Sequence, residues 1–396
     1  MRYAGLTDTR YGGGADDVAD VSLASKLLKF NWLLAALLAA AASVGFVMLY
    51  SVAGGSLDPW ARSQIVRFAV GFGAMILVAL IDIRFWKALA LPFYAITLAL
   101  LIAVEFFGEI GMGAQRWINL GVVQLQPSEP MKIALVMVLA LYYQWLPPKK
   151  VSRPLWILVP LLLAAAPTLL VIKQPDLGTA LLLLAGAFVV MFLAGVSWWF
   201  FALLGVAGGG VVLAVLVSQG TDWQILKDYQ YRRIFTFIDP STDPLGAGYH
   251  ITQSITAIGS GGVAGKGLLQ GTQTHLSFLP EPHTDFIFTT LAEEFGFIGG
   301  LSLLCLFILI VFVALASSFR IKNSFGRLLS AGVATTFFFF FAINIAMVTG
   351  LAPVVGVPLP LVSFGGTSML VLMIGFGLAI SAQIHGDLNF RSRSTL

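Results

Sequence analysis

"EEFGFIGGLSLLCLFILIVFVAL" (residues 293–315) opens with two carboxylates and continues as an apolar run to Leu315. A run of about 20 such residues is long enough to cross the hydrocarbon core of a membrane as a helix. Lipid does not tolerate a carboxylate, so Glu293 and Glu294 are expected to face the protein interior. The stretch therefore predicts a membrane-spanning helix with ionisable groups buried near its start.

The rest of the chain has the same apolar character. It is 58% hydrophobic and only 11% charged, and its mean hydropathy of +0.91 lies outside the range of soluble domains. The alternating segments that membrane β-barrels require do not occur. We therefore predict an all-α polytopic membrane protein with about ten transmembrane helices. The expected spans are 31–53, 64–81, 86–106, 127–146, 154–172, 177–195, 197–218, 286–317, 327–351 and 366–384.

Most of the 23 Lys and Arg residues lie on one side of these spans, many of them in short loops such as "DIRFWK" (82–87), "LPPKKVSRP" (146–154) and "RIKNSFGR" (320–327). Short loops rich in Lys and Arg stay in the cytoplasm, so both termini are expected there. Residues 1–30 are polar and are predicted to form a disordered cytoplasmic leader. The membrane domain is expected over 31–384, followed by a cytoplasmic tail at 385–396.

A large outer loop, residues 219–285, is expected between the seventh and eighth spans. It contains "DYQYRRIFTFIDP" (228–240) and "GAGYHITQSITAIGSGG" (246–262), which are too aromatic and β-branched for a disordered segment. Loops of this length are usually functional unless they are disordered. We expect short amphipathic helices that fold over the bundle on its outer side.

The start of the fourth span carries a charged group in the segment "AQRWINLGVVQLQPSEPMK" (114–132). Glu129 and Lys132 are spaced i, i+3, so an ion pair that anchors the helix at the membrane surface explains them. Lys132, however, lies about one turn inside the span, where a charged group by default marks a functional site. Arg116 precedes the pair on the same outer side.

Two more polar clusters lie on this side, in "QPDLGT" (174–179) and "PEPHTDF" (280–286). Asp176 and Asp285 each stand at a helix start, where N-capping is the simplest role. Capping does not account for Glu281 and His283 beside Asp285, nor for the two glutamates further along the same helix. Three polar clusters from separate parts of the chain, all on one side, predict a shared polar cavity.

Other patterns indicate no additional chemistry. "GSGGVAGKG" (259–267) resembles a phosphate loop, but Ser260 and Gly267 break the pattern. The four His lack ligand spacing, so no structural metal is predicted, and the single Cys excludes an internal disulfide. The net charge of +4 is too diffuse for nucleic-acid binding. We interpret the run "TTFFFFFAIN" (335–344) as bulky side chains that face lipid.

From about residue 31 to residue 384 the chain resembles the SEDS family (shape, elongation, division and sporulation). The motifs that carry the resemblance are "RWINLGVVQLQPSEPMK", "QPDLGT", "DPLGAGYHITQS", "AIGSGGVAGKG", "GTQTHLSFLPEPHTDFIF", "EEFGFIG" and "PVVGVPLPLVSFGG". Within the family, "GTQTHLSFLPE" and "PVVGVPLPLVSFGG" are more similar to the elongation (RodA-type) branch than to the division (FtsW-type) branch.

The resemblance implies a ten-span peptidoglycan glycosyltransferase in the bacterial cytoplasmic (inner) membrane. Its substrates would be lipid II and polyprenyl-diphosphate-linked glycan, polymerised on the outer face during cell-wall elongation and rod-shape maintenance. Its expected partners are a class B penicillin-binding protein (a transpeptidase) and the elongation machinery. The resemblance assigns no cofactor and leaves open a divalent cation, Mg²⁺ or Mn²⁺.

Carried onto this sequence, the family's essential acid is Asp285. The charged residues of its other motifs are Arg116, Glu129, Lys132, Asp176 and, in "YQYRR", Arg233. A sugar hydroxyl needs a base to accept its proton, and Asp285 is the candidate, with Glu281 or His283 tuning it. Cations near the departing diphosphate lower the barrier.

Three alternatives stay open at this point. A flippase for lipid-linked precursor shares the fold and the substrate, but it needs polar residues along the whole transmembrane path. A division-type polymerase shares the chemistry. A purely structural scaffold leaves the buried acids unexplained.

Overall fold

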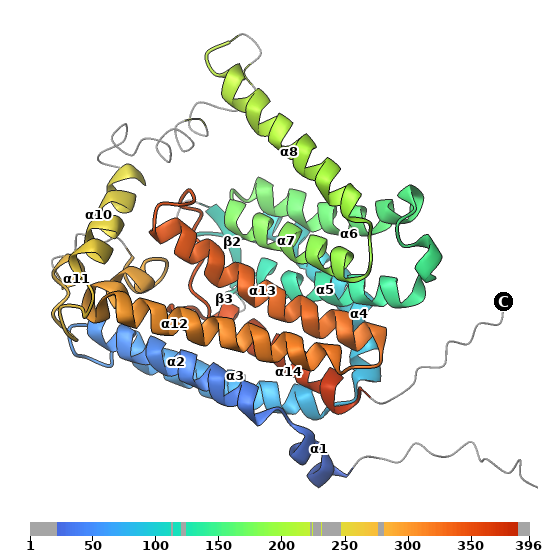
Figure 1. Ribbon diagram of the computed structural model, residues 1–396, viewed down its shortest axis with the longest axis horizontal. Helices are drawn as coiled ribbons and strands as arrows, with labels where there is room; N and C mark the ends of the chain where they lie inside the picture. Colours follow the sequence, from blue (N-terminus) through green and yellow to red (C-terminus); the bar gives the residue numbers. More distant parts are fainter. Residues whose placement is uncertain are drawn as a thin grey trace, which may run out of the picture.

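The structure, a computed structural model, describes residues 22–111, 114–119, 124–221, 224, 231, 247–275 and 281–386 (Figure 1). Ten long helices lie within these ranges, and each coincides with an expected span. They are α2 (Trp32–Val52), α3 (Ala61–Leu80), α4 (Ile83–Phe107), α5 (Ser128–Trp145), α6 (Pro154–Lys173), α7 (Leu177–Leu193), α8 (Trp198–Ser218), α12 (Ile287–Phe319), α13 (Ser324–Val348) and α14 (Thr367–Ile384). The predicted all-α membrane fold is confirmed.

Eight helices in the described part of the chain are long and apolar enough to cross a membrane. The other two are shorter or more polar: α7 has 17 residues, and α5 carries Glu129 and Lys132 near its start. Both helices pack inside the bundle, α7 against α6 and α13, and α5 against α4 and α13. Protein neighbours therefore shield the polar start of α5.

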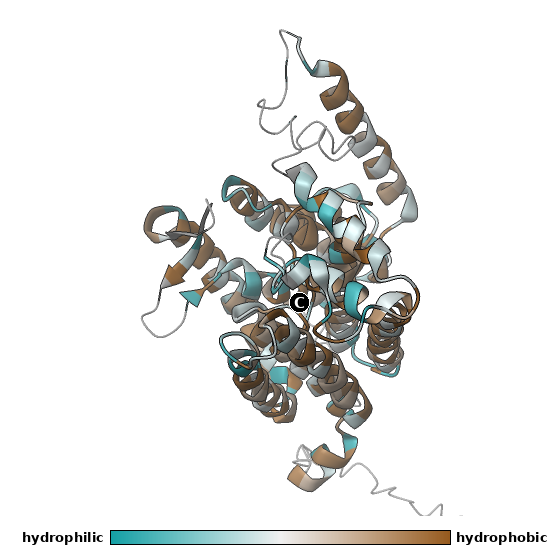
Figure 2. Cartoon of the chain, turned by 90° about the vertical axis from the view of Figure 1, so that its left-hand side faces the viewer, coloured by the Kyte–Doolittle hydropathy of each residue, from teal (hydrophilic) through white to brown (hydrophobic). Residues whose placement is uncertain are grey.

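The helices differ in how deeply they are buried. In the most apolar 18-residue window of each helix, 72% of α14 is buried and only 6% of α8. Figure 1 shows α8 leaning away from the other helices, and many of its apolar side chains are more than half exposed. Figure 2 shows hydrophobic residues along the helices and hydrophilic ones mainly on loops and helix ends.

The aromatic run 335–344 belongs to the core, so its interpretation as lipid-facing bulk is wrong. Phe337, Phe340 and Phe341 are buried, whereas Phe338 is 40% exposed. The reason is that α13 packs against α5, α7, α12 and α14, so most sides of the helix meet protein. Asn344, at the end of the run, is also completely buried.

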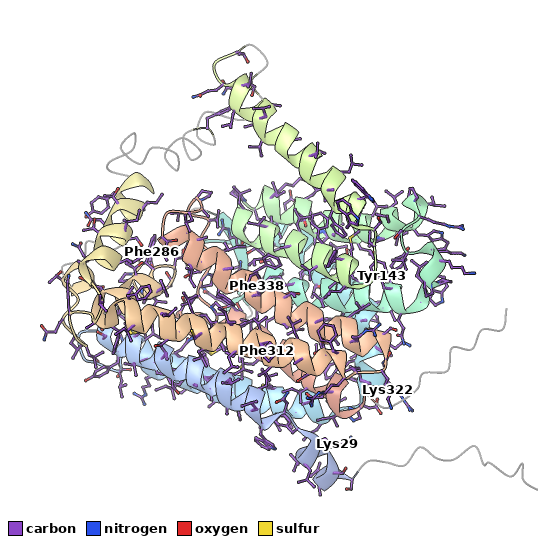
Figure 3. All side chains as sticks on the ribbon, in the orientation of Figure 1. Lys29, Tyr143, Phe286, Phe312, Lys322 and Phe338 are labelled. Atoms are coloured by element: carbon purple, nitrogen blue, oxygen red, sulfur yellow. The ribbon has the colours of Figure 1, made fainter. Side chains whose placement is uncertain are left out.

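The two ends of the bundle have different character. Figure 3 places Phe286 at one end, here called the site end, and Lys29 and Lys322 at the opposite end. The opposite end also carries α1 (Leu23–Lys29) and the 3₁₀ turn η1 (Pro148–Lys150). Lys26 Nζ donates to Leu80 O at 2.9 Å, which ties α1 to the end of α3.

The expected disordered leader therefore needs a correction at its C-terminal part, because residues 23–29 form a helix that contacts the bundle. Residues 1–21 and 387–396 lie outside the described residues. The boundaries predicted for the leader, the membrane domain and the tail stay predictions.

The site end has elements outside the spans. Strands β1 (Glu109–Gly111), β2 (Ala114–Asn119) and β3 (Gln124–Leu125) form a small antiparallel sheet that the sequence analysis did not predict. Trp117 faces Glu109, and Ile118 faces Leu125. In the large loop, the described residues form α10 (Ala247–Ser260) and the short α11 (Thr272–His275). The sheet positions Arg116 at the site end.

Candidate active site

Asp285 lies in the turn that leads into α12, and the backbone of this turn is held by three neighbours. Asn344 Nδ2 of α13 donates to Asp285 O at 2.9 Å, and Ser363 Oγ donates to Thr284 O at 2.6 Å. Phe364 N donates to His283 O at 2.8 Å. The turn is therefore fixed by α13 and by the segment that precedes α14.

The side chain of Asp285 does not cap its helix. The N-cap of α12 is Phe286, and none of the described side chains caps it. Asp285 Oδ2 instead lies beside Gly356, 3.6 Å from the position that a Cβ there would take. The capping explanation for Asp285 is thus not supported, and its carboxylate points to the segment that connects α13 to α14.

The charges around Asp285 come from three parts of the chain. Burial, followed by the negative charges of Glu281 and Asp176, raises the pKa of Asp285 to about 6, and Arg116 acts in the opposite direction. Residues from all three predicted clusters therefore meet at one place. A carboxyl group with a pKa of about 6 is ionised at neutral pH and is still basic enough to accept a proton.

Asp176 caps its helix and also contacts Arg116 and Gln126. Its Oδ1 accepts from Thr179 N at 3.2 Å, so it caps α7. Its Oδ2 lies 3.9 Å from Arg116 Nη1 and accepts from Gln126 Nε2 at 3.3 Å. Arg116 also donates to Gln174 O at 3.1 Å. The guanidinium thus joins the β2 strand to the start of α7.

Glu129 and Lys132 form a buried ion pair, with Lys132 Nζ 2.6 Å from Glu129 Oε1. Lys132 Nζ also lies 4.1 Å from the ring centroid of Phe340. Within the described part of the chain, Glu129 Oε2 and Ser128 Oγ have no hydrogen-bond partner. Both side chains are less than a tenth exposed, so the pair lies inside the protein rather than on its surface.

Glu281 and His283 lie at the rim of the turn. His283 Nε2 is 3.4 Å from Glu281 Oε2, and its ring stacks on Trp60 with centroids 4.5 Å apart. Burial lowers the pKa of His283, while Glu281 raises it. The ring therefore holds the turn against the start of α3 chiefly by stacking.

Glu293 and Glu294 are buried, as the opening stretch predicts, at 0% and 1% exposure. Their partners, however, are not those of Asp285. Lys266 Nζ lies 2.6 Å from Glu293 Oε1, and Ser51 Oγ donates to Glu294 Oε1 at 2.5 Å. The expectation that all the acids of this stretch share one cavity with Asp285 is therefore not supported.

A known family matches this arrangement of helices and motifs. The family model FtsW/RodA/SpoVE, described as "cell cycle protein", matches residues 31–387. The chain belongs to this family. The resemblance to the SEDS family is thereby confirmed, and it extends over almost all of the described helices.

Relatives of this FtsW/RodA/SpoVE chain include curated and solved proteins. It is 44% identical over 341 residues to peptidoglycan glycosyltransferase MrdB of Escherichia coli (strain K12), covering 86% of this chain and 89% of MrdB. A solved peptidoglycan synthase complex that coordinates polymerization and crosslinking contains a chain that is 33% identical to this one, with a TM-score of 0.77. The match covers 89% of this chain and 97% of that chain. The rod shape determining protein RodA of Thermus thermophilus is 29% identical, with a TM-score of 0.67, and the match covers 91% of this chain and 98% of RodA.

Several polar residues of this family member escaped the sequence analysis. Gln64 Nε2 donates to Ser363 O at 2.8 Å, and Arg67 lies 4.6 Å from the ring centroid of Phe364. Asn344 Nδ2 donates to Val357 O at 2.7 Å as well as to Asp285 O. Their positions could have revealed them, because Gln64, Arg67 and Asn344 lie within predicted spans. Polar side chains there seldom face lipid and are therefore expected to have partners inside the protein.

Among the residues that the structure describes, no group of three or more His, Cys, Asp or Glu could hold a metal ion. The Mg²⁺ or Mn²⁺ left open by the resemblance stays a prediction. Arg233 lies outside the described residues.

Proposed function

We propose that this chain polymerises lipid II into β-1,4-linked glycan strands, with Asp285 as the general base. That the chain is a peptidoglycan glycosyltransferase follows from its family membership and its 44% identity to MrdB. The observation that carries the assignment of the base is the environment of Asp285, where burial and neighbouring acids bring the pKa to about 6.

The reaction joins two lipid-linked saccharides. The 4-hydroxyl oxygen of one saccharide attacks C1 of the other, and the new C1–O bond forms as the bond from C1 to the diphosphate breaks. The electron pair leaves with the polyprenyl diphosphate, and Asp285 accepts the hydroxyl proton. The configuration at C1 inverts from α to β. A positioned base of this kind typically contributes ~10²–10⁴-fold to the rate.

The departing diphosphate needs positive charge close to its oxygens. Arg116 is the best described candidate, because its guanidinium faces both Asp176 and the surroundings of Asp285. Lys132 is a weaker candidate because it is paired with Glu129. Arg233 keeps the role that the resemblance implies.

A flippase would need polar groups through the depth of the membrane. The buried Asp, Glu, Lys and Arg side chains that the structure describes are Glu129, Lys132, Asp176, Glu293 and Glu294. All of them lie in or near the first turns of helices at the site end, so the described core offers no charged path to the opposite end. This distribution favours a polymerase that works at one surface.

Location and partners complete the proposal. The site end of the protein is the end that faces the outer side of the bacterial cytoplasmic membrane, because the opposite end carries the basic loops, α1 and the end of α14. It acts with a class B penicillin-binding protein in the elongation machinery. The match to a solved complex of polymerization and crosslinking supports this partner, and the matches to MrdB and RodA favour the elongation branch over the division branch.

The test is glycan-strand formation from lipid II by purified Asp285→Asn, with and without the transpeptidase partner. Asn keeps the shape of the side chain but cannot accept the proton, so we expect a loss of ~10²–10⁴-fold. Asp58→Asn is the matched control, because Asp58 is an exposed acid in the loop between α2 and α3. Near-normal product from folded Asp285→Asn would remove Asp285 from the chemistry.

A further inference from the structure

Helix α12 is broken at Gly296, which has φ 66° and ψ −163°. A loop from outside the helix replaces the hydrogen bonds that the break removes. Phe297 N donates to Gly262 O at 2.9 Å, and Ile298 N donates to Val263 O at 3.1 Å. On the other side of the break, Lys266 N donates to Glu293 O at 3.1 Å. The loop 261–267 is therefore built into the helix.

The close fit depends on glycine at two positions of this loop. A Cβ at Gly265, which has φ +82°, would collide with the carbonyl oxygen of Glu294. A Cβ at Gly261 would collide with the carbonyl oxygen of Ala292. The glycines of "GSGGVAGKG" therefore serve backbone contact with α12 rather than phosphate binding.

A side-chain cluster reinforces this contact, here called the clasp: Lys266, Thr272, Gln273, Thr274 and Glu293. Glu293 Oε1 accepts from Lys266 Nζ at 2.6 Å, from Gln273 N at 3.0 Å and from Thr272 Oγ1 at 3.1 Å. Glu293 is fully buried, whereas the Lys266 side chain is 25% exposed. One buried carboxylate thus holds both ends of the segment 266–273.

The residues between Asp285 and the break have further ties to the same outer segment. Ser254 of α10 and Thr289 share a hydrogen bond of 2.7 Å, and Thr274 Oγ1 donates to Thr290 Oγ1 at 3.1 Å. The first part of α12, residues 287–295, is therefore separated from the rest of the helix by the break and fastened to α10 and the clasp instead.

We propose that Glu293 and Lys266 are positioning residues that set the place of the Asp285 carboxylate. They do not touch the reacting atoms. They act by locking the segment 287–295, which begins two residues after Asp285, to the outer loop across the break. A continuous helix would hold residues 287–295 through its own hydrogen bonds, but here the clasp takes over that task and keeps the segment in place behind the turn that carries Asp285. The inference rests on the proposed role of Asp285 as general base.

Glu293→Gln and Lys266→Met test the clasp in the full-length protein. The glutamine keeps the volume and one acceptor oxygen but loses the charge, and the methionine removes the cation. Displacing a catalytic group by about 1 Å can cost ~10²-fold in rate, so we expect kcat to fall roughly tenfold or more with little change in KM. The matched control is Glu105→Gln, because Glu105 and Lys173 form an exposed pair at 3.6 Å.

Two readouts separate positioning from a general loss of folded protein. Hydrogen exchange should quicken in residues 287–295 of both clasp variants and stay unchanged in Glu105→Gln. The midpoint of the acidic limb of the pH–rate profile should also move, because Asp285 changes its distance to Glu281, Asp176 and Arg116.

Unchanged exchange in 287–295, or normal kcat in the folded variants, would overturn the inference. A lower kcat with an unmoved acidic limb would overturn it as well, provided that Asp285→Asn abolishes that limb. If the acidic limb of the pH–rate profile persists in Asp285→Asn, the assignment of Asp285 as the base is wrong instead. Faster hydrogen exchange in the clasp variants would then still show that the clasp holds residues 287–295. The two failures are therefore distinguishable.

Discussion

Two aspartates at helix starts show how far a residue type constrains its role. Asp176 caps α7 through Thr179 N, which is the ordinary role of an acid at that position. Asp285 stands two residues before α12, and Phe286 takes the N-cap position. Its carboxylate is therefore not occupied by the backbone of its own helix. The same residue type thus has a structural role at one helix and is a candidate base at the other.

The pKa of Asp285 makes a prediction about pH. A base must be ionised, so kcat/KM should fall as the pH falls through about 6, the pKa of Asp285. Glu281 raises that pKa, and Glu281→Gln should therefore move the acidic limb to lower pH, by a small amount because Glu281 is solvent-exposed. Initial rates of lipid II polymerisation between pH 5 and 8 measure both. An acidic limb that persists unchanged in Asp285→Asn would contradict the assignment.

Lys132 makes a second prediction at this scale. Removing one partner of a buried ion pair costs about 3–5 kcal/mol, because the other charge is left buried and unpaired. Lys132→Met should therefore lower the melting temperature as well as the activity. The double variant Glu129→Gln/Lys132→Met should recover most of the stability. If it also recovers polymerisation, the pair is structural, whereas a stable but inactive double variant assigns it to the site.

At the scale of elements, the site is made where the start of α7 meets the segment between α13 and α14. A Cβ at Gly178 would lie 2.6 Å from Val355 O and 2.6 Å from Val357 Cγ2. Gly356, between these two residues, lies beside Asp285 Oδ2. Contact between the two elements therefore sets the distance from the start of α7 to the candidate base.

Gly178→Ala tests this contact. The added methyl group must push the segment 355–357 away, so we expect polymerisation to fall roughly tenfold or more while the protein still inserts into the membrane. Gly210→Ala in α8 is the control, because nothing lies within 4 Å of the Cβ it adds. Normal activity of Gly178→Ala, measured with lipid II, would show that the segment 355–357 can move aside without displacing Asp285.

The topology belongs to the whole molecule, because it follows from all the helices together. Residue 320 lies at the end of α12 that shares a side with α1 and η1, and residue 263 lies in the loop at the site end. The predicted orientation puts the first in the cytoplasm and the second outside.

Single cysteines at positions 320 and 263, in a chain with Cys305 replaced by Ser, test this orientation in intact cells. Val263 is chosen because it is 68% exposed and its side chain takes no part in the clasp. An impermeant thiol reagent should label residue 263 and not residue 320. Equal labelling of the two positions would refute the topology.

Sequence by itself determined the membrane fold, the places of the ten long helices and the polar clusters of Arg116, Asp176 and Asp285. These features are local, because hydrophobic length, helix starts and the cost of a charge in lipid can each be judged within a short window. Only the tertiary structure decided which clusters meet. It placed Asp176 and Arg116 near Asp285, paired Glu293 with Lys266, and brought the Asn344 side chain within hydrogen-bond distance of the Asp285 backbone. Each of these contacts joins residues that lie far apart in the chain, and the break of α12 at Gly296 is stable because a distant loop supplies the missing hydrogen bonds.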